Sequence, residues 1–374
     1  MIRERQAQFE ISLAGPSQVP PDIYLIIVDG YGRADFLKDI YGYDNAQFIE
    51  FLEEKGFYVA DQARSNYPLT QLSLPSLMNL QYLDEYTREF GGTDNLAPAY
   101  ELIQHSTIRR VLEDRGYQFV ALTSATLLTQ IRDADVYLSL ENNDLNEFEA
   151  LLLSTSVMGV AAESWGFDLP VMSYELHRKY VVFSLDKLSE VPELPGPKFV
   201  FAHIMLPHPP FMFDRAGNFI PPERPYVTWD GSLFPGTTEE YQNGYLEQVI
   251  FLNQKLTGMI SDILARSANP PIIILQGDHG PGAFYNVLEL DTACLAERYS
   301  ILNAYYFPDG DYQQLYPSIT PVNSFRVVLN QYFGAELDLL EDRSYFAGWL
   351  SPYVYTDVTD QIHLPCNTSG RQAP

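Results

Sequence analysis

The chain has 374 residues, of which 46% are apolar and 19% are charged, and this balance is typical of a globular protein rather than a disordered or fibrous one. Its formal net charge of -26 repels nucleic-acid phosphates at long range and argues against a nucleic-acid-binding protein. An acidic protein can still act on an anionic substrate where a bound metal ion offsets the field locally.

The chain is expected to consist of one domain with two tails. Residues 1–19 are polar and lack the apolar stretch of a signal peptide, and the chain has no run of about 18 apolar residues that could cross a bilayer. We predict a catalytic α/β domain at 20–335 and a C-terminal extension at 336–374 that packs on it. The sequence leaves the cellular location open, because a soluble part of a membrane protein would have the same pattern.

Continuous apolar runs predict buried β-strands at 23–28, 57–60, 117–122, 198–204, 271–276 and 299–307. Helices are expected between them at 45–55, 100–115 and 239–266. Strands that alternate with helices predict an α/β fold of three layers around a doubly wound, mostly parallel sheet. Ligands bind beyond the carboxyl ends of the strands in such sheets, so polar residues at those ends are candidates for a site.

Residues 124–180 do not fit this alternation, and we interpret them as an insertion or cap near the ligand-binding edge of the sheet. Within them, residues 148–162 form an apolar stretch that predicts a helix too short to cross a membrane. An ordinary core helix is the simpler interpretation of this stretch. A substrate cap or a membrane-facing surface is the alternative.

Asp29, Asp278 and His279 follow two of the predicted strands. Asp29 comes directly after the run 23–28, and Asp278 and His279 come shortly after 271–276. A mixture of carboxylate and imidazole favours zinc or manganese, because magnesium and calcium prefer shells of oxygen atoms. We therefore expect these side chains to bind one divalent metal ion. Each motif alone is also compatible with a polar turn after a strand.

The segment 66–76 contains two candidate nucleophiles, Thr70 and Ser73. Proline is tolerated in the first turn of a helix, so we expect a helix to begin near Ser73–Pro75 with its free N–H groups facing an anion. Thr70, just before it, is expected to attack an ester and to complete the metal shell, because a metal lowers the pKa of a hydroxyl group. Ser73 is the alternative nucleophile or substrate-binding residue, and a plain helix cap is an equally good interpretation.

Two histidines belong to the run 198–204 and the segment that follows it. His203 still lies on the strand and is expected to be a core residue. His208 lies in a loop stiffened by three prolines. A histidine held rigidly at the ligand edge is a candidate to bind substrate or to protonate a leaving group.

Arg298 lies just before the last predicted strand. Its guanidinium group could offer a bidentate fork to a phosphoryl oxygen, which makes it a candidate substrate-binding residue. An ion pair at the surface with Glu297 or another carboxylate is the simpler interpretation.

The two cysteines, Cys294 and Cys366, form no cluster typical of a structural zinc site. Their spacing does not decide between one disulfide and two unpaired thiols, and the unpaired thiols are at least as good an interpretation.

The order Asp-Gly, Thr-x-x-Ser-x-Pro, His-x4-His-x-Pro and Asp-His-Gly over about residues 20–310 resembles the sulfatase-like branch of the alkaline phosphatase superfamily. The nearest resemblance is to lipid A phosphoethanolamine transferases and lipoteichoic acid synthases. It implies a phospho-threonine intermediate on Thr70, metal ligands at Asp29, Asp278 and His279, and a substrate-side role for His208. It also implies a phosphate or sulfate ester as the substrate, such as a lipid or glycan, and an extracytoplasmic setting at a membrane.

Three features depart from this pattern. The transferases carry a further histidine after Asp-His-Gly, whereas the only later histidine here is His363, which argues against a second metal. Two cysteines cannot reproduce the several disulfides of the transferases. Sulfatases need an arginine where Leu77 stands, so phosphoester chemistry is expected here rather than sulfate-ester hydrolysis. Sulfate-ester hydrolysis through Ser73 is the alternative. A member without catalytic activity that binds lipid head groups is a further alternative.

Overall fold

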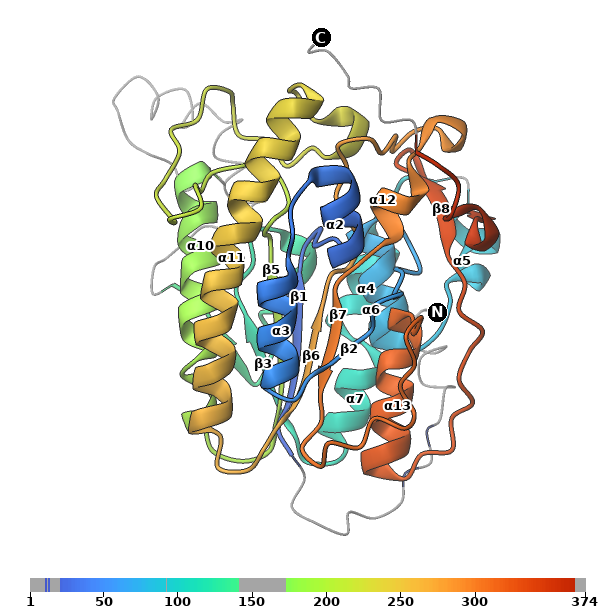
Figure 1. Cartoon of the computed structure of the whole chain (residues 1–374). Helices are drawn as coiled ribbons and strands as arrows, with labels where there is room; N and C mark the ends of the chain where they lie inside the picture. The colour runs from blue at the N-terminus through green and yellow to red at the C-terminus, as the bar shows by residue number, and fades with distance from the viewer. Residues whose placement is uncertain (1–10, 12, 14–20, 92, 141–172, 367–374) are drawn as a thin grey trace, which may run out of the picture.

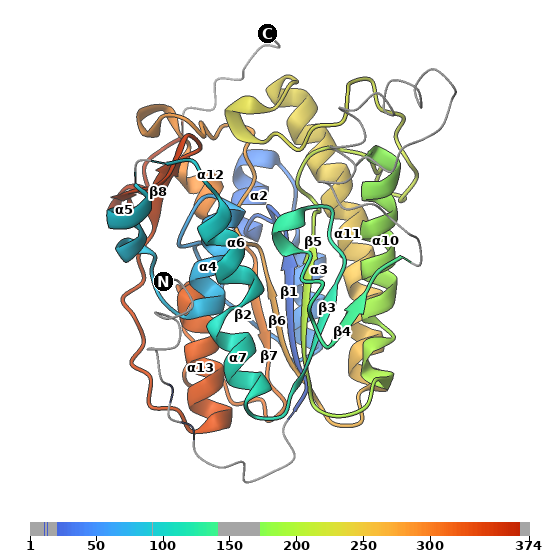
Figure 2. The same cartoon turned by 180° about the vertical axis from the view of Figure 1, so that it is seen from behind.

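The computed structural model describes residues 11, 13, 21–91, 93–140 and 173–366. Its centre is a seven-stranded sheet in the order β2-β7-β6-β1-β5-β3-β4 (Figures 1 and 2). The strands from β6 to β4 are parallel, whereas β7 runs antiparallel to β6 and β2 runs antiparallel to β7. The predicted mostly parallel sheet is therefore confirmed. The strands are β1 (Ile23–Val28), β2 (Tyr58–Val59), β3 (Gln118–Leu122), β4 (Val136–Leu138), β5 (Lys198–Ile204), β6 (Ile272–Gln276) and β7 (Asn303–Tyr306).

Helices cover both faces of the sheet and complete the three predicted layers. The even-numbered residues of β1 belong to one apolar core and the odd-numbered residues to another, so its continuous apolar run buries both faces. One face is covered by α2 (Ala34–Tyr41), α3 (Ala46–Glu54), α10 (Tyr174–Leu188) and α11 (Thr238–Arg266) (Figure 1). The other is covered by α4 (Thr70–Asn79), α6 (Ala97–Gln104), α7 (Thr107–Glu113) and α13 (Pro321–Phe333) (Figure 2).

The long helix α11 begins with a capping box. The Glu240 N–H donates to Thr237 Oγ1 at 3.1 Å, and the Thr237 N–H donates to Glu240 Oε2 at 2.6 Å. This reciprocal pair satisfies two of the backbone donors that a helix start leaves free. The capping box therefore fixes the residue at which α11 begins, directly after the loop that connects it to β5.

A small hairpin lies beside the sheet. It is formed by β8 (Tyr345–Gly348) and β9 (Ser351–Asp357). The Tyr345 N–H donates to the Asn66 carbonyl oxygen at 2.9 Å, and the Trp349 N–H donates to the Val287 carbonyl oxygen at 2.9 Å. Described residues of the C-terminal extension therefore contact the segment that precedes α4. Two short helices, α5 (Asp84–Phe90) and α12 (Leu295–Tyr299), lie near this hairpin (Figure 1).

Several elements differ from the sequence prediction. The helix expected at 100–115 is two helices, α6 and α7, which are separated by His105 and Ser106. The strand expected at 299–307 is the shorter β7, preceded by α12. Within 124–180, β4 adds an edge strand to the main sheet, whereas the helix expected at 148–162 lies outside the described residues. Among the helices that are described, none is long and apolar enough to cross a membrane.

Cys294 and Cys366 form a disulfide. The interpretation as two unpaired thiols is therefore wrong. The spacing could not reveal the pair, because 72 residues separate the two positions and only the folded chain brings them together. The disulfide links the residue before α12 to the C-terminal extension.

Candidate metal centre and active site

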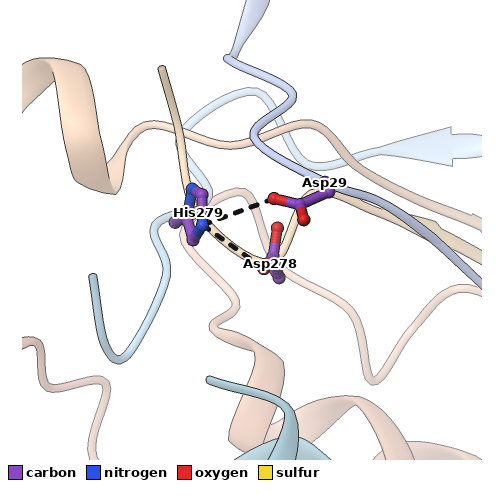
Figure 3. A group of neighbouring side chains, drawn as sticks. All are labelled: Asp29, Asp278 and His279. Carbon is purple, nitrogen blue, oxygen red and sulfur yellow. Dashed lines mark ion pairs between the residues drawn. The ribbon is translucent and has the colours of Figure 1, made fainter. Parts of the chain in front are cut away.

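Adjacent strands bring Asp29, Asp278 and His279 to one edge of the sheet. Asp29 follows β1, and Asp278 and His279 follow β6, which pairs with β1 in parallel register. Figure 3 shows the three side chains gathered at these strand ends. The Gly30 N–H donates to Asp278 Oδ1 at 3.1 Å and fixes one loop against the other. The predicted convergence of these residues is therefore present in the fold.

The three side chains form a buried cradle for a cation. His279 Nε2 lies 3.4 Å from Asp29 Oδ1 and 3.5 Å from Asp278 Oδ2. One ligand atom from each residue lies within 4.8 Å of the others. Asp29 Oδ1 and Asp278 Oδ2 are buried without a hydrogen-bond donor from any described residue. Buried carboxylate oxygens without partners are costly unless a cation lies between them, so this donor set fits a divalent metal ion.

Thr70 is the first residue of α4, and its Oγ1 lies 3.3 Å from His279 Nε2. The expected helix start near Ser73–Pro75 is wrong by about one turn. The Leu69 carbonyl oxygen already accepts from the N–H groups of Leu72 and Ser73, both at 2.9 Å, so the helix begins before Pro75 and contains it. Thr70 therefore lies at the helix N-terminus itself, where free N–H groups and the helix dipole favour an anion.

Ser73 lies in the second turn of α4 rather than at its cap, so the cap role is wrong. Its side chain is buried, and its Oγ donates to the Asp278 carbonyl oxygen at 2.5 Å. This bond fixes α4 against the loop that carries Asp278 and His279. The hydroxyl group of Ser73 is thereby engaged with the backbone rather than directed at the cavity described below.

His203 is buried on β5, as expected, but it also belongs to the surroundings of the cradle. Its Nε2 lies 3.3 Å from Asp29 Oδ2, and its Nδ1 lies 2.9 Å from Thr129 Oγ1. If the Thr129 hydroxyl group donates to Nδ1, the proton on Nε2 faces Asp29. Burial raises the pKa of Asp29, but His208, His203 and His279 outweigh it and hold this pKa below its usual value. Asp29 is therefore ionised and has Oδ1 available to a cation.

His208 is held at the same edge by its backbone. The His208 N–H donates to the Asp29 carbonyl oxygen at 3.1 Å, and Gln248 Nε2 donates to the His208 carbonyl oxygen at 3.2 Å. The His208 Nδ1 lies 2.6 Å from the Pro209 carbonyl oxygen, which leaves Nε2 facing Asp230 Oδ2 at 3.8 Å. Burial lowers the pKa of His208, but Asp29 and Asp230 outweigh it and raise this pKa. The imidazole is therefore suited to carry a proton at Nε2.

Arg298 pairs with a carboxylate, as the simpler interpretation expected, but the partner is Asp230 rather than Glu297 and both side chains are buried, so the expected surface position is wrong. Its Nε donates to the Pro68 carbonyl oxygen at 2.7 Å, and its Nη1 donates to Asp230 Oδ2 and to the Gly280 carbonyl oxygen, the latter at 3.1 Å. Nη2 lies 3.3 Å from His279 Nε2. Because protein oxygens occupy Nε and Nη1, the guanidinium group retains only Nη2 for a substrate, and the expected bidentate fork is not available.

A cavity of about 120 Å³ opens over these groups. Thr70, His208, His279 and Arg298 line it, and Ser73 does not. Apart from Asp29, the other lining residues could not be predicted from the sequence; among them, Trp229, Asp230 and Trp349 lie in a loop and a hairpin turn without a motif or periodic pattern. The complete lining is Asp29, Leu69, Thr70, Gln71, Thr126, Leu128, Met205, His208, Thr228, Trp229, Asp230, Leu233, His279, Val287, Arg298 and Trp349.

Comparison with known proteins supports the fold. No family model matches the sequence, and no curated protein is significantly similar to it. Among solved structures, the C-terminal periplasmic domain of EcEptC from Escherichia coli matches with a TM-score of 0.59 at 13% identity, over 94% of this chain and 97% of that domain. The same domain has also been solved in complex with zinc, and it matches with a TM-score of 0.59 at 14% identity.

Two other enzymes extend this likeness. The integral membrane lipooligosaccharide phosphoethanolamine transferase EptA from Neisseria meningitidis matches with a TM-score of 0.52 at 15% identity, over 86% of this chain and 56% of that protein. BT1596, a 2-O GAG sulfatase, matches with a TM-score of 0.50 at 12% identity, over 85% of this chain and 72% of that protein. At these identities the comparison bears on the fold. The chain has an alkaline-phosphatase/sulfatase-like fold, as its motif order predicts.

Proposed function

We propose that the chain is a metal-dependent enzyme that transfers or hydrolyses phosphoryl or substituted phosphoryl groups through a covalent phospho-threonine intermediate on Thr70. The observation that carries this proposal is the position of the Thr70 hydroxyl group, which lies at the start of α4 and 3.3 Å from His279 Nε2 beside two unpartnered buried carboxylate oxygens. A nucleophile, a cation cradle and a helix N-terminus thus meet in one cavity.

Asp29, Asp278, His279 and Thr70 would hold one divalent ion. Two carboxylates and an imidazole favour zinc or manganese over magnesium or calcium, and the EcEptC domain of the same fold has been solved with zinc. When bound, such an ion favours the alkoxide form of a hydroxyl group and offsets negative charge on a phosphoryl group.

Each of the site residues has its own role in the proposed reaction. Thr70 Oγ1 forms a bond to phosphorus as the bond from phosphorus to the leaving oxygen breaks, and the hydroxyl proton passes to solvent. His208 gives the proton on Nε2 to the leaving oxygen. Arg298 Nη2 and the free N–H groups at the start of α4 donate to the phosphoryl oxygens. Water or an acceptor alcohol then attacks phosphorus as the bond from phosphorus to Thr70 Oγ1 breaks, His208 Nε2 takes the proton of the attacking oxygen, and Thr70 Oγ1 regains a proton from solvent, giving hydrolysis or transfer.

Two alternatives to this reaction are separable by experiment. Sulfate-ester hydrolysis through Ser73 is disfavoured because the Ser73 hydroxyl group donates to a backbone oxygen and does not line the cavity. A member without activity that binds lipid head groups would not need a nucleophile next to the cradle. Incubation with a phosphodiester substrate, followed by peptide mass spectrometry, tests all three. A phosphoryl group on Thr70 supports the proposal, whereas a modified Ser73 or an unmodified protein without turnover would overturn it.

We also propose a setting outside the cytoplasm. Disulfides persist in oxidising compartments, and Cys294 is bonded to Cys366. The EcEptC domain is periplasmic, and EptA is an integral membrane protein. A phosphate or sulfate ester of a lipid or glycan, rather than a nucleic acid, is the substrate class that this setting and the net charge of -26 favour.

The domain organisation remains part of the proposal. Residues 20–335 would form the catalytic domain, with 124–180 as an insertion or cap and 336–374 as an extension packed on it. The contacts of β8 with the segment before α4 support the placement of the extension.

A further inference from the structure

Asp230 lies in the loop between β5 and α11 and lines the candidate active site. Its side chain is buried, and its two oxygens have different partners. Oδ2 accepts from Arg298 Nη1 and faces His208 Nε2 at 3.8 Å, and Oδ1 accepts from the Tyr241 hydroxyl group at 2.7 Å. One carboxylate therefore contacts or faces both groups to which we assign substrate-side roles.

We propose that Asp230 is a positioning residue that orients Arg298 and His208 toward the phosphoryl group, an inference that rests on the proposed function. Arg298 joins three segments of the site, because it donates to Pro68 before α4, to Gly280 after the Asp-His pair and to Asp230. Of these acceptors only Asp230 carries a charge. Its charge-assisted bond is thus the strongest constraint on where Nη2 points.

Tyr241 holds Asp230 in its place. The Tyr241 hydroxyl group donates to Asp230 Oδ1 at 2.7 Å and accepts from the Gly282 N–H at 2.8 Å. Asp230 Oδ1 lies so close to Gly282 that a Cβ atom there would approach it to 2.8 Å. The rigid helix α11 thereby fixes a carboxylate that belongs to a loop, and the carboxylate in turn fixes the arginine.

Asp230 also offsets positive charge beside the cradle. Arg298 Nη2 is only 3.3 Å from His279 Nε2, so its positive charge would repel a divalent ion in the cradle. Asp230 offsets that charge without occupying a position in the cradle itself, since it is not among the clustered ligand residues. Arg298 can then approach a phosphoryl group beside the ion.

The test compares Asp230→Asn with Asp133→Asn, a matched control that removes a carboxylate from another arginine, Arg109, outside the cavity. Three quantities are measured: kcat and KM on a phosphodiester, the Kd of inorganic phosphate, and the metal content. We expect Asp230→Asn to lower kcat/KM by about 10- to 100-fold and to weaken phosphate binding, because small misplacements of a positioned group have effects of this size. Metal content stays stoichiometric, and Asp133→Asn changes neither kinetics nor phosphate binding.

A double-mutant cycle with Arg298→Met separates positioning from stability. If Asp230 acts through Arg298, the effect of Asp230→Asn on the Kd of phosphate shrinks to less than about threefold in the Arg298→Met background. An equal loss in both backgrounds, a loss of metal, or kinetics and phosphate binding unchanged from the parent would each overturn the inference.

Tyr241→Phe is the milder variant, and it tests the positioning role of Asp230 if Asp230→Asn does not fold. It removes the hydrogen bond to Asp230 and the acceptor of the Gly282 N–H but keeps the ring and the charge of Asp230, so we expect phosphate binding to weaken about 3- to 10-fold with metal content unchanged, in line with the loss of a hydrogen bond to a charged group. Unchanged phosphate binding would contradict the inference. The phosphate arms do not depend on turnover. A parent protein that binds phosphate but cleaves no ester therefore contradicts the proposed function alone.

Discussion

Thr70 Oγ1 lies 3.3 Å from His279 Nε2, although 209 residues separate the two in the chain. The contact arises because α4 begins at Thr70 and Ser73, one turn later, donates to the backbone of Asp278. Helix α4 and the loop after β6 are therefore held as one unit. Thr70 and the cation cradle keep their relative positions through this unit, which is the preorganisation that the proposed phosphoryl transfer would require.

The first prediction concerns the metal. Asp278→Ala and His279→Ala should each abolish stoichiometric binding of a divalent ion, because each removes a ligand from a cradle of three clustered residues. Elemental analysis after gel filtration measures this directly. Asp94→Ala, which removes an exposed carboxylate, is the control and should keep the metal. Equal metal content in parent and both cradle variants would show that the assignment is wrong.

The second prediction separates Thr70 from Ser73. Thr70→Ala should eliminate turnover, whereas Thr70→Ser, which keeps a hydroxyl group, should retain part of it. Ser73→Ala should keep activity and lower the free energy of unfolding by about 1–2 kcal/mol, since it removes a buried hydrogen bond to the Asp278 carbonyl oxygen. Steady-state kinetics and denaturant unfolding measure the two effects. Turnover by Thr70→Ala together with an inactive Ser73→Ala would reverse the assignment.

The cation cradle could be predicted from the sequence because its geometry follows from topology. Residues directly after neighbouring parallel strands must meet at one edge, so Asp29 and the Asp278–His279 pair could be placed together from apolar runs alone. The start of α4 could not be predicted, because the preference of proline for the first turn of a helix places that start near Pro75. The helix instead begins at Thr70, and Ser73 in its second turn donates to the Asp278 carbonyl oxygen, a tertiary contact that the local sequence does not indicate.

Asp230 shows why other parts of the site could not be predicted. It lies in an irregular loop, and it contacts Arg298, which is 68 residues away, with α11 and β6 between them in the chain. The burial of Arg298 could not be predicted either, because nothing in the sequence around it indicates that three segments converge on its guanidinium group. Such contacts are properties of tertiary packing rather than of local pattern.

The third prediction distinguishes the two histidines. His208→Ala should lower kcat by about 100-fold or more and retain the metal, as is typical for loss of a general acid. His203→Ala should weaken metal affinity by about 10- to 100-fold, because His203 faces Asp29 Oδ2 from outside the cradle and outer-shell partners have effects of this size. Metal titration and kinetics on both variants measure this. The assignment of the two roles fails if His208→Ala loses the metal and His203→Ala does not.

The fourth prediction concerns Glu297, a buried carboxyl group next to Arg298 in α12. Its oxygens accept from the Tyr41 hydroxyl group and the Phe284 N–H, both at 2.7 Å, and burial raises its pKa from 4.5 to about 7. The folded state therefore retains this proton at pH values where the unfolded state has lost it. The contribution of the protonated Glu297 carboxyl group to the free energy of unfolding is fully present below pH 4.5, falls as the pH rises toward 7 and is lost above it.

Glu297→Gln tests this contribution, because the amide cannot ionise. The free energy of unfolding of the parent should fall relative to that of the variant between pH 4.5 and about 7, by an amount on the order of a few kcal/mol, and the difference should then level off. Glu50→Gln, which replaces an exposed carboxyl group on α3, is the control and should follow the parent. Denaturant unfolding at closely spaced pH values measures all three proteins. Parallel curves for the parent and Glu297→Gln would show that Glu297 ionises in the folded state as readily as in the unfolded state, and that its burial beside Arg298 does not make the site region sensitive to pH.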